Sequence, residues 1–276
     1  MKIHVLTCFF RRREITKIYL EGIKRLSKYF DIDYTFVSSE PEDTALLQEL
    51  GYITHVFENH PLSDKWQFGL NKALEKKWDY LLIMGSDDLL SNEGLELLLD
   101  NSYSNKGFGD IMFYNSPTKE WAYMKYDKAR LIGAGRLISR EAIENTMFRS
   151  TIHFKIDQSV AGVGYKNYSD ISVPTSTAEY LKNINFGKIV GNEKRVIWNK
   201  GLTKSLDHSS EMSLSLAGYP PYKVESDKIH LIDIKGEVVV TQWQNLLKVS
   251  TLTDFDMWFL SDKEKDMIRD LPIPPP

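Results

Sequence analysis

The stretch YLLIMGSDDLLS, residues 80–91, places two adjacent aspartates at the end of an apolar run. Residues 80–84 have the length and composition of a buried strand. Asp87 and Asp88 repel each other when both are ionised, and a divalent cation relieves that repulsion because Mg²⁺ and Mn²⁺ prefer oxygen ligands. The alternative is an acidic loop in which one aspartate caps the next helix and the other is solvated. Taken alone, the stretch favours the loop, so its surroundings have to decide.

The residues before this stretch alternate between strand and helix patterns. Runs rich in β-branched and aromatic residues predict strands, and runs with an apolar stripe at helical spacing predict helices. Such alternation predicts an α/β fold with a mostly parallel central sheet and helices on both faces. We expect strands within 2–10, 30–39, 52–59 and 79–86, and helices within 14–29, 41–51 and 63–78.

Ligands of such sheets bind beyond the carboxyl ends of the strands, where the loops converge. Asp87 and Asp88 fall at one of these ends, residues 38–40 at a second and residues 7–13 at a third. The two aspartates therefore lie where a parallel sheet binds its ligand, which favours the cation site.

The pattern is weaker after residue 91, although each segment still favours one type of element. We expect helices within 92–102, 129–146 (after a Gly-Ala-Gly turn), 156–168 and 253–271, strands within 110–116 and 120–127, and hairpins within 186–200 and 227–243.

The composition is that of a soluble globular protein: 276 residues, 42% hydrophobic and 26% charged. A net charge of −3 gives no general attraction to nucleic acid or anionic membranes. Cys8 is the one cysteine, which excludes intrachain disulfides and cysteine-based zinc sites. The sequence has no apolar stretch of about 18 residues and no secretory signal pattern, so we expect no membrane span and a cytoplasmic location.

Four short motifs occur in an order that is informative as a set. They are Thr7–Arg11 after the first strand, Val37–Glu40 after the second, Lys65–Ala73 on a helix, and Ser86-Asp87-Asp88. This order resembles the nucleotide-sugar-binding half of family 2 glycosyltransferases, which have the GT-A fold. The resemblance implies a catalytic domain at 1–180, with a donor half (1–100) and an acceptor half (101–180). Beyond residue 180 it implies nothing specific, and the sequence pattern predicts an α+β extension at 181–276 with hairpins and a final helix.

The resemblance also implies roles for single residues. Asp88 would be a ligand of Mn²⁺ or Mg²⁺, and Asp87 would contact the donor ribose. Thr7 and Phe9 would line the base pocket, with Ser39 or Glu40 reading the base edge. Family members often carry Asp where Ser39 falls, so the identity of the base is not predicted.

Several basic and small residues have both a donor-site and a structural interpretation. Arg11, in the run Arg11–Arg13, would pair with a donor phosphate, or the run is a solvated basic turn. Lys65 and Asn71 belong to the donor site or to the helix alone. Gly135 and Arg136 would lie close to donor or acceptor, or they follow Gly133 in a tight turn.

An inverting transferase needs a base for the acceptor hydroxyl. By the resemblance this is an Asp at a helix N-terminus, and Asp157 is the candidate, with a simple helix cap as the alternative. Asp110 and Asp170 suit the role less well. His208 would complete the metal sphere, or it lies on a surface loop. The aromatic group Trp121, Tyr123 and Tyr126 is acceptor surface or ordinary strand packing.

The resemblance therefore implies a metal-dependent, inverting hexosyl- or pentosyltransferase that moves a sugar from a nucleotide-diphosphate donor to an acceptor hydroxyl. The acceptor, a glycan, lipid-linked sugar, protein or modified nucleic-acid base, is not predicted, and neither is the oligomeric state. One alternative is a sugar-phosphate nucleotidyltransferase. Such enzymes usually carry a glycine-rich loop with basic residues after the first strand, and residues 7–14 (TCFFRRRE) have the basic residues without the glycines, which counts against this alternative. The other alternative is a non-catalytic protein that binds nucleotide sugars.

Overall fold

The computed structural model describes the chain except residues 127–129, 161–162, 204–205, 237–242 and 273–276, and the side chains of 154–169 also lie outside the described part. Helices in the described part are α1 (Arg13–Leu26), α2 (Pro41–Glu49), α3 (Leu62–Leu74), α4 (Asn92–Leu99), α5 (Arg140–Met147), α6 (Thr175–Asn183), α7 (Leu206–Leu216), α8 (Trp243–Leu246) and α9 (Asp262–Arg269). Strands are β1 (Lys2–Phe9), β2 (Asp31–Ser38), β3 (Thr54–Val56), β4 (Tyr80–Ile83), β5 (Asp88–Leu90), β6 (Asn105–Phe108), β7 (Asp110–Asn115), β8 (Glu120–Lys125), β9 (Arg136–Ser139), β10 (Phe148–Val160), β11 (Val163–Pro174), β12 (Gly187–Lys194), β13 (Tyr222–Val224), β14 (Leu231–Lys235) and β15 (Thr251–Leu252).

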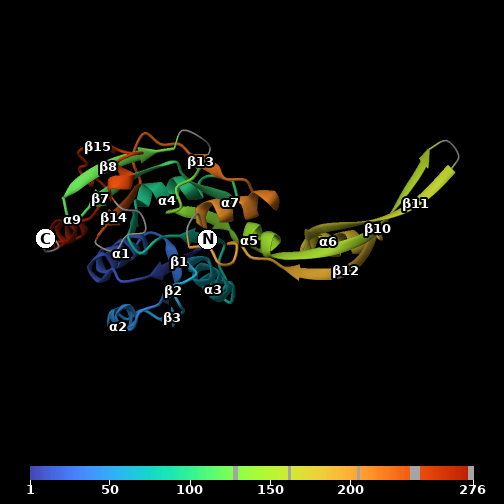
Figure 1. Cartoon of the computed structure of the whole chain (residues 1–276), viewed down its shortest axis with the longest axis horizontal. Coiled ribbons are helices and arrows are strands. Elements are labelled where there is room, and N and C mark those ends of the chain that lie inside the picture. Colours follow the sequence, from blue (N-terminus) through green and yellow to red (C-terminus); the bar gives the residue numbers. More distant parts are fainter. Residues whose placement is uncertain (127–129, 161–162, 204–205, 237–242, 273–276) are drawn as a thin grey trace.

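A seven-stranded sheet forms the centre of the molecule, in the order β13-β6-β9-β4-β1-β2-β3 (Figure 1). The pairs β1–β2, β1–β4, β2–β3 and β13–β6 are parallel, and β9 runs antiparallel to both of its neighbours. The first four strands and the helices between them follow the predicted alternation. The α/β fold with a mostly parallel sheet is therefore confirmed.

Helices cover this sheet because each has one apolar face. The predicted stripe of α1 is buried, from Ile15 through Ile18, Tyr19 and Ile23 to Leu26. Helix α3 packs on β1 and β2. With both faces covered, all residues of β1 from Ile3 to Phe9 are buried, as expected for a central parallel strand.

A second sheet has the order β15-β8-β7-β14-β5 and combines distant parts of the chain. Strand β14 lies between β7, to which it is parallel, and β5, to which it is antiparallel. Asp233 of β14 is thereby the register partner of Asp88 of β5. Residues beyond 181 thus contribute β13 to one body sheet and β14 and β15 to the other, while the division at residue 180 remains a prediction.

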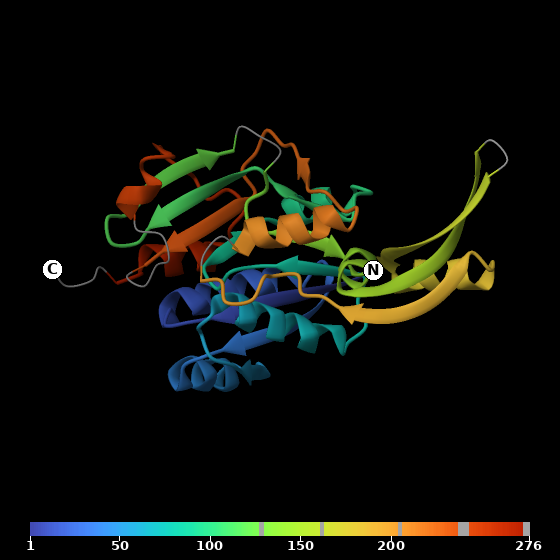
Figure 2. The same ribbon diagram turned by 45° about the vertical axis from the view of Figure 1, so that its right-hand side comes forward.

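A long arm, made of β10, β11, β12 and α6, projects from the body (Figures 1 and 2). Strand β10 pairs with β11 over twelve residue pairs and with β12 on its other edge. The helix predicted within 156–168 is therefore wrong where the structure describes it, because residues 149–160 pair with residues 163–174 as antiparallel strands. The hairpin predicted within 186–200 is also wrong: β12 is one strand, and the register against β10 shifts between Thr151 and Ile152.

The C-terminal predictions were confirmed in part. The first run of 227–243 forms β14, whereas residues 237–242 of that predicted hairpin lie outside the described part. The helix predicted over 253–271 is shorter and spans only α9, but its capping box of Ser261 and Glu264 is present. No helix among the described residues is both long and apolar enough to cross a bilayer.

Candidate functional site

The turn after β4 brings the two adjacent aspartates close to the backbone. The N–H of Gly85 donates to Asp88 Oδ2 at 2.5 Å. A Cβ at residue 85 would lie 2.7 Å from Asp88 Oδ2 and 2.8 Å from Asp87 Oδ1, so only glycine allows this approach. Helix α4 is capped by Ser91, whose hydroxyl accepts from the N–H of Gly94. Neither aspartate caps the helix, so the alternative of an acidic loop with a capping aspartate is wrong on this point.

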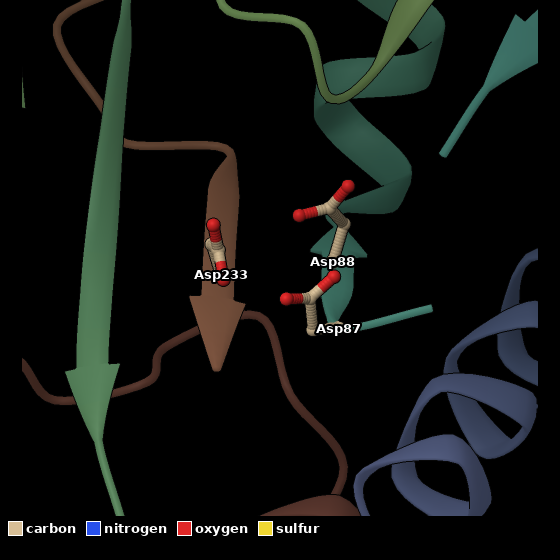
Figure 3. A group of neighbouring side chains, drawn as sticks. All are labelled: Asp87, Asp88 and Asp233. Atoms are coloured by element: carbon tan, nitrogen blue, oxygen red, sulfur yellow. The ribbon is translucent and has the colours of Figure 1, made fainter. Parts of the chain in front are cut away.

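A third carboxylate completes the group. Asp233 lies opposite Asp88, and one carboxylate oxygen from each of Asp87, Asp88 and Asp233 lies within 4.8 Å of the other two (Figure 3). The N–H of Ile234 donates to the carbonyl of Asp87 at 2.8 Å, which fixes the two strands together at this point. Among the described residues, Asp233 Oδ1 is buried without a hydrogen-bond partner. Three converging carboxylates with one oxygen unsatisfied fit a hard divalent cation.

Two basic side chains face these carboxylates. Arg12 forms an ion pair with Asp87, and Lys235 forms one with Asp233 and lies 3.9 Å from Asp87. The side chains of Arg12 and Lys235 are only 13% and 11% exposed. The group therefore carries three acids against two bases, which leaves it one negative charge when all are ionised.

Burial and mutual repulsion alter how readily these acids ionise. Burial raises the pKa of Asp233 to about 6, with Asp87 adding to the rise and Lys235 opposing it. Burial also raises the pKa of Asp88 well above its usual range, and Asp87 and Asp233 raise it further. Burial alone would lower the pKa of Lys235, but the adjacent carboxylates outweigh it and raise that pKa. A bound cation would favour the ionised carboxylates.

The three aspartates line a cavity of about 720 Å³, a size typical of small-molecule sites. Besides charged and polar residues, the cavity has an apolar wall that comes from the second sheet, the end of α8 and the segments that follow β8 and α8. Lining residues include Arg12, Lys65, Arg136, Asp207, Ser210 and Lys235, and the wall includes Ile111, Phe113, Met124, Tyr126, Leu246 and Val249.

The predicted base-pocket residues lie one position away from the cavity wall. Thr7 and Phe9 are buried in the core, where the hydroxyl of Thr7 lies 2.5 Å from that of Tyr19. Successive side chains of a strand point to opposite faces, so Cys8 and Phe10 line the cavity instead. The prediction for Thr7 and Phe9 is corrected by this register.

The basic run after β1 divides into different contacts. Arg11 is exposed and forms an ion pair with Glu40 at 3.1 Å, and Arg13 lies 3.9 Å from Glu49. Arg12, and not the predicted Arg11, is the arginine that reaches the cavity. Glu40 precedes α2 as its N-cap residue and is engaged by Arg11.

The other predicted donor residues differ in position. The hydroxyl of Ser39 is buried and has no hydrogen-bond partner in the part of the chain that the structure describes. Lys65 lines the cavity, and its ammonium donates to the carbonyl of Phe9 at 2.6 Å; burial lowers its pKa. Asn71 accepts from Gln67 at 3.4 Å on α3, one turn along the helix, which suits a structural role.

The Gly-Ala-Gly turn before β9 needs glycine for its backbone conformation, and it also forms part of the cavity wall. Gly135 has a φ of +67°, and a Cβ there would lie 2.7 Å from Leu231 Cδ2, which explains glycine. Arg136 is buried and lines the cavity, where its guanidinium donates to Ser210 Oγ at 2.8 Å and Asn105 Oδ1 at 3.1 Å. It ties β9 to α7 and β6.

The predicted base and histidine ligand lie outside the carboxylate group. Asp157 is on β10 of the arm, opposite Lys166, and not at the expected helix N-terminus; its side chain lies outside the described part. Its catalytic role stays a prediction. His208 is exposed on α7 and is not a member of the three-carboxylate group found among the described residues. Its neighbour Asp207, in the first turn of α7, lines the cavity.

The predicted aromatic group is divided between two faces of the second sheet. Tyr126 lines the cavity. Trp121 and Tyr123 face the opposite side and pack in a core cluster with Phe255 and Met257. For these two, strand packing is the correct alternative.

Sequence reasoning missed Asp233, Lys235 and Asp207. The signal for the first two is the run LIDIK, residues 231–235, in which an acid and a base alternate with apolar residues in a buried strand. Residues at every second position of a strand share one face, so Asp233 and Lys235 lie on the same side of β14. Asp207 had the signal expected for the base, an Asp at the start of a helix, but it was overlooked beside His208.

These features define an α/β protein with a cavity at the carboxyl ends of its parallel strands. Three aspartates and several basic side chains line this cavity. No family model matches the sequence, and no match was found among curated proteins. The structure is similar to the mannosyltransferase PcManGT from Pyrobaculum calidifontis, in complex with GDP-Man and Mn²⁺, at 10% identity and a TM-score of 0.44, with 84% of this chain and 56% of that one covered.

Two other solved structures are similar over different lengths. A glycosyltransferase involved in glycosylation of the major capsid of PBCV-1 is 15% identical with a TM-score of 0.33, over 52% of this chain and 63% of that one. A CMP:2-keto-3-deoxy-manno-octonic acid synthetase in complex with CTP is 10% identical with a TM-score of 0.38, over 90% and 97%. The chain thus spans less than two thirds of both glycosyltransferases. Membership of family 2 remains a prediction.

Proposed function

We propose that this chain is a metal-dependent glycosyltransferase that uses a nucleotide-diphospho-sugar donor. The observation that carries the proposal is the group Asp87, Asp88 and Asp233 on the wall of a cavity at the carboxyl end of β4. Carboxylates suit a divalent cation, and the adjacent basic side chains Arg12 and Lys235 suit an anion. A metal and a diphosphate are the two charged components of such a donor complex.

The three aspartates would hold Mn²⁺ or Mg²⁺. When bound, the ion would supply positive charge to the leaving diphosphate. The protein's own contribution is to orient the carboxylates through the Gly85 turn and the β5–β14 pairing, and to exclude water by burying Asp87 and Asp88 to 7% and 6% exposure.

Asp207 is the base that we favour within this proposal, in competition with Asp157 on the arm. Asp207 lines the same cavity as the metal group. Asp207 is exposed on the cavity wall, so an acceptor hydroxyl has access to its carboxylate. Partial desolvation of the carboxyl raises its pKa, although Arg136 lowers it, and a raised pKa suits proton abstraction. The carboxylate would take the proton of the acceptor hydroxyl as its oxygen bonds to the anomeric carbon. The bond from that carbon to the diphosphate oxygen breaks, and its electron pair leaves with the diphosphate.

The experiment that tests this function compares two products. The purified chain is incubated with UDP-, GDP-, CDP- and ADP-sugars and either Mn²⁺ or Mg²⁺, and release of the nucleoside diphosphate is measured with and without candidate acceptor sugars. A parallel reaction with nucleoside triphosphates and sugar phosphates measures pyrophosphate. Pyrophosphate without diphosphate would replace the transferase by a nucleotidyltransferase. Thermal stabilisation by a nucleotide sugar without either product would indicate a non-catalytic binding protein.

A further inference from the structure

Arg12 and Lys235 occupy an unusual position for basic residues. Arg12 is the N-cap residue of α1 and Lys235 the last residue of β14, yet both reach Asp87, and Lys235 also pairs with Asp233. Both side chains are nearly buried, and both line the cavity. Lys235 Nζ also lies 5.4 Å from the centre of the Phe113 ring, which supports it against the apolar wall.

Stability alone is a weak reason for this arrangement. Removing an arginine, a lysine and three carboxylates from water costs more than their pairing returns in many proteins, and apolar residues of equal volume stabilise as well. The ion pairs also hold both basic groups next to a cavity of about 720 Å³, within which long side chains can change rotamer. A guanidinium fork and an ammonium are the two side-chain groups that bind phosphate oxygens best.

We propose that Arg12 and Lys235 are diphosphate-binding residues, which exchange their carboxylate partners for the phosphate oxygens of a nucleoside diphosphate. The proposal rests on the proposed function for the identity of the ligand. Asp87 and Asp233 hold the two basic groups in place in the ligand-free chain, and the anion competes with them. Once the basic groups move to the anion, they no longer balance the negative charge of the two carboxylates.

This exchange couples two ligands. A diphosphate that removes Arg12 and Lys235 from the acids strengthens the attraction of those acids for a divalent cation, and by linkage the cation strengthens diphosphate binding by the same factor. The exchange therefore predicts that removing a basic partner weakens diphosphate binding, whereas removing an acidic partner strengthens it when no metal is present.

The first test measures calorimetric affinities for UDP, GDP, CDP and ADP, and for the corresponding nucleosides, with Mn²⁺. The tightest diphosphate is then titrated into Lys235→Met and Arg12→Gln. Each loses a charge-assisted contact, so we expect affinity to fall about 10- to 100-fold for the diphosphate and to stay unchanged for its nucleoside. Lys235→Arg should keep most of the affinity. Lys24→Met, which removes an exposed ammonium paired with Glu21 on α1, is the matched control and should bind as the unaltered chain does.

The second test reverses the sign by altering an acid. Asp233→Asn releases Lys235 from its partner, so without metal it should bind the diphosphate several-fold more tightly than the unaltered chain. With Mn²⁺ it should bind less tightly, because a metal ligand is lost. Both measurements report binding and need no turnover. Since Asp233→Asn keeps the size of the side chain and removes one of three adjacent carboxylates, it tests the exchange even where the Lys235 and Arg12 variants fold poorly.

Failure of the proposed function and failure of the exchange give different results. If the unaltered chain binds no nucleoside diphosphate with either metal, the proposed function fails. If it binds one, while Lys235→Met and Arg12→Gln bind equally well or Asp233→Asn gains nothing without metal, the exchange alone is refuted.

Discussion

The cavity and the arm each contain a carboxylate for which the sequence predicted a catalytic role: Asp88 as a metal ligand and Asp157 as the base. The surroundings of these two carboxylates differ. Asp88 is buried and lies beside two other aspartates and their basic partners. Asp157 belongs to a hairpin that projects from the body (Figure 2), with β12 on one edge and α6 as its helix. On the arm, large apolar side chains such as Tyr180, Ile184 and Val190 remain more than half exposed.

The difference lies in how many distant segments converge on each site. The cavity wall is built from the loops after β1 and β4, from β14 and from the start of α7, and residues from 8 to 249 line it. The arm is built from one continuous segment, residues 148–194. Convergence of several segments excludes water. Exclusion of water raises the pKa of a carboxyl group and strengthens the attraction between a carboxylate and a bound cation. Four experiments test this contrast.

The largest effect is expected for Asp88→Asn. The variant keeps an oxygen to accept from Gly85 but loses a metal ligand, so kcat should fall by at least about 1,000-fold and thermal stabilisation by Mn²⁺ should vanish. Its thermal midpoint in a chelator should not fall, because a repelling buried charge is removed. The matched change on the arm is Asp170→Asn at an exposed position, which should leave kcat and the Mn²⁺ response unchanged. Retention of the Mn²⁺ response in Asp88→Asn would move the metal elsewhere.

A smaller effect distinguishes the two candidate bases. Asp207→Asn should lower kcat by at least about 100-fold with little change in donor affinity, because it removes the proton acceptor and leaves the metal group intact. Asp157→Asn should lower kcat by less than about 10-fold. Transfer rates at saturating donor, with donor affinity measured separately, give the comparison. A larger loss for Asp157→Asn would bring the arm into the active site and reverse the contrast between the two regions.

The same contrast explains how far the sequence could predict the site. Asp87 and Asp88 were predictable because a strand and its end are local features. The pairing that adds Asp233 joins residues far apart in the chain, and the run LIDIK carries no sign of its partner. Thr7 and Phe9 were chosen in place of Cys8 and Phe10 because both faces of β1 are buried, so its sequence has no alternation that indicates the cavity side.

Predictions on the arm were wrong for a different reason. The glycines within 156–168 predicted the end of a helix, whereas Gly164 belongs to β11 and Gly162 lies outside the described residues. Helix and strand compete closely in short segments with few apolar residues, and tertiary pairing decides between them. Here the twelve pairs with β11 decide for the strand.

Two histidines extend the comparison to pH. His4 is buried in β1, with Nε2 2.8 Å from Thr35 Oγ1, and burial lowers its pKa to about 4 from 6.5. The unfolded chain therefore takes up a proton below pH 6.5 that the folded chain refuses, so stability falls as pH drops from about 6.5 to 4. Denaturant unfolding at pH 7 and 4.5 should show the chain losing about 1 to 3 kcal/mol more than His4→Gln does.

The arm histidine is the control for this measurement. His153 is partly exposed and paired with Asp170 at 2.7 Å, and exposed ion pairs contribute little to stability. His153→Gln should therefore change the pH dependence of unfolding by less than about 0.5 kcal/mol. Equal slopes for His4→Gln and the unaltered chain would mean that His4 is solvated in the folded protein.

The smallest expected effect compares one glycine from each region. Gly85→Ala places a Cβ 2.7 Å from Asp88 Oδ2 and 2.8 Å from Asp87 Oδ1, so the carboxylates must move and Mn²⁺ affinity should fall about 10-fold. Gly191→Ala, on β12 of the arm, meets nothing within 4 Å and should leave Mn²⁺ affinity unchanged. Its unfolding free energy should stay the same or rise by up to about 1 kcal/mol, because alanine restricts the unfolded chain. Calorimetry with Mn²⁺ and denaturant unfolding measure both variants. If Gly191→Ala lowered the free energy of unfolding or the Mn²⁺ affinity, the arm would be packed closely at this position, and close packing would no longer distinguish the cavity wall from the arm.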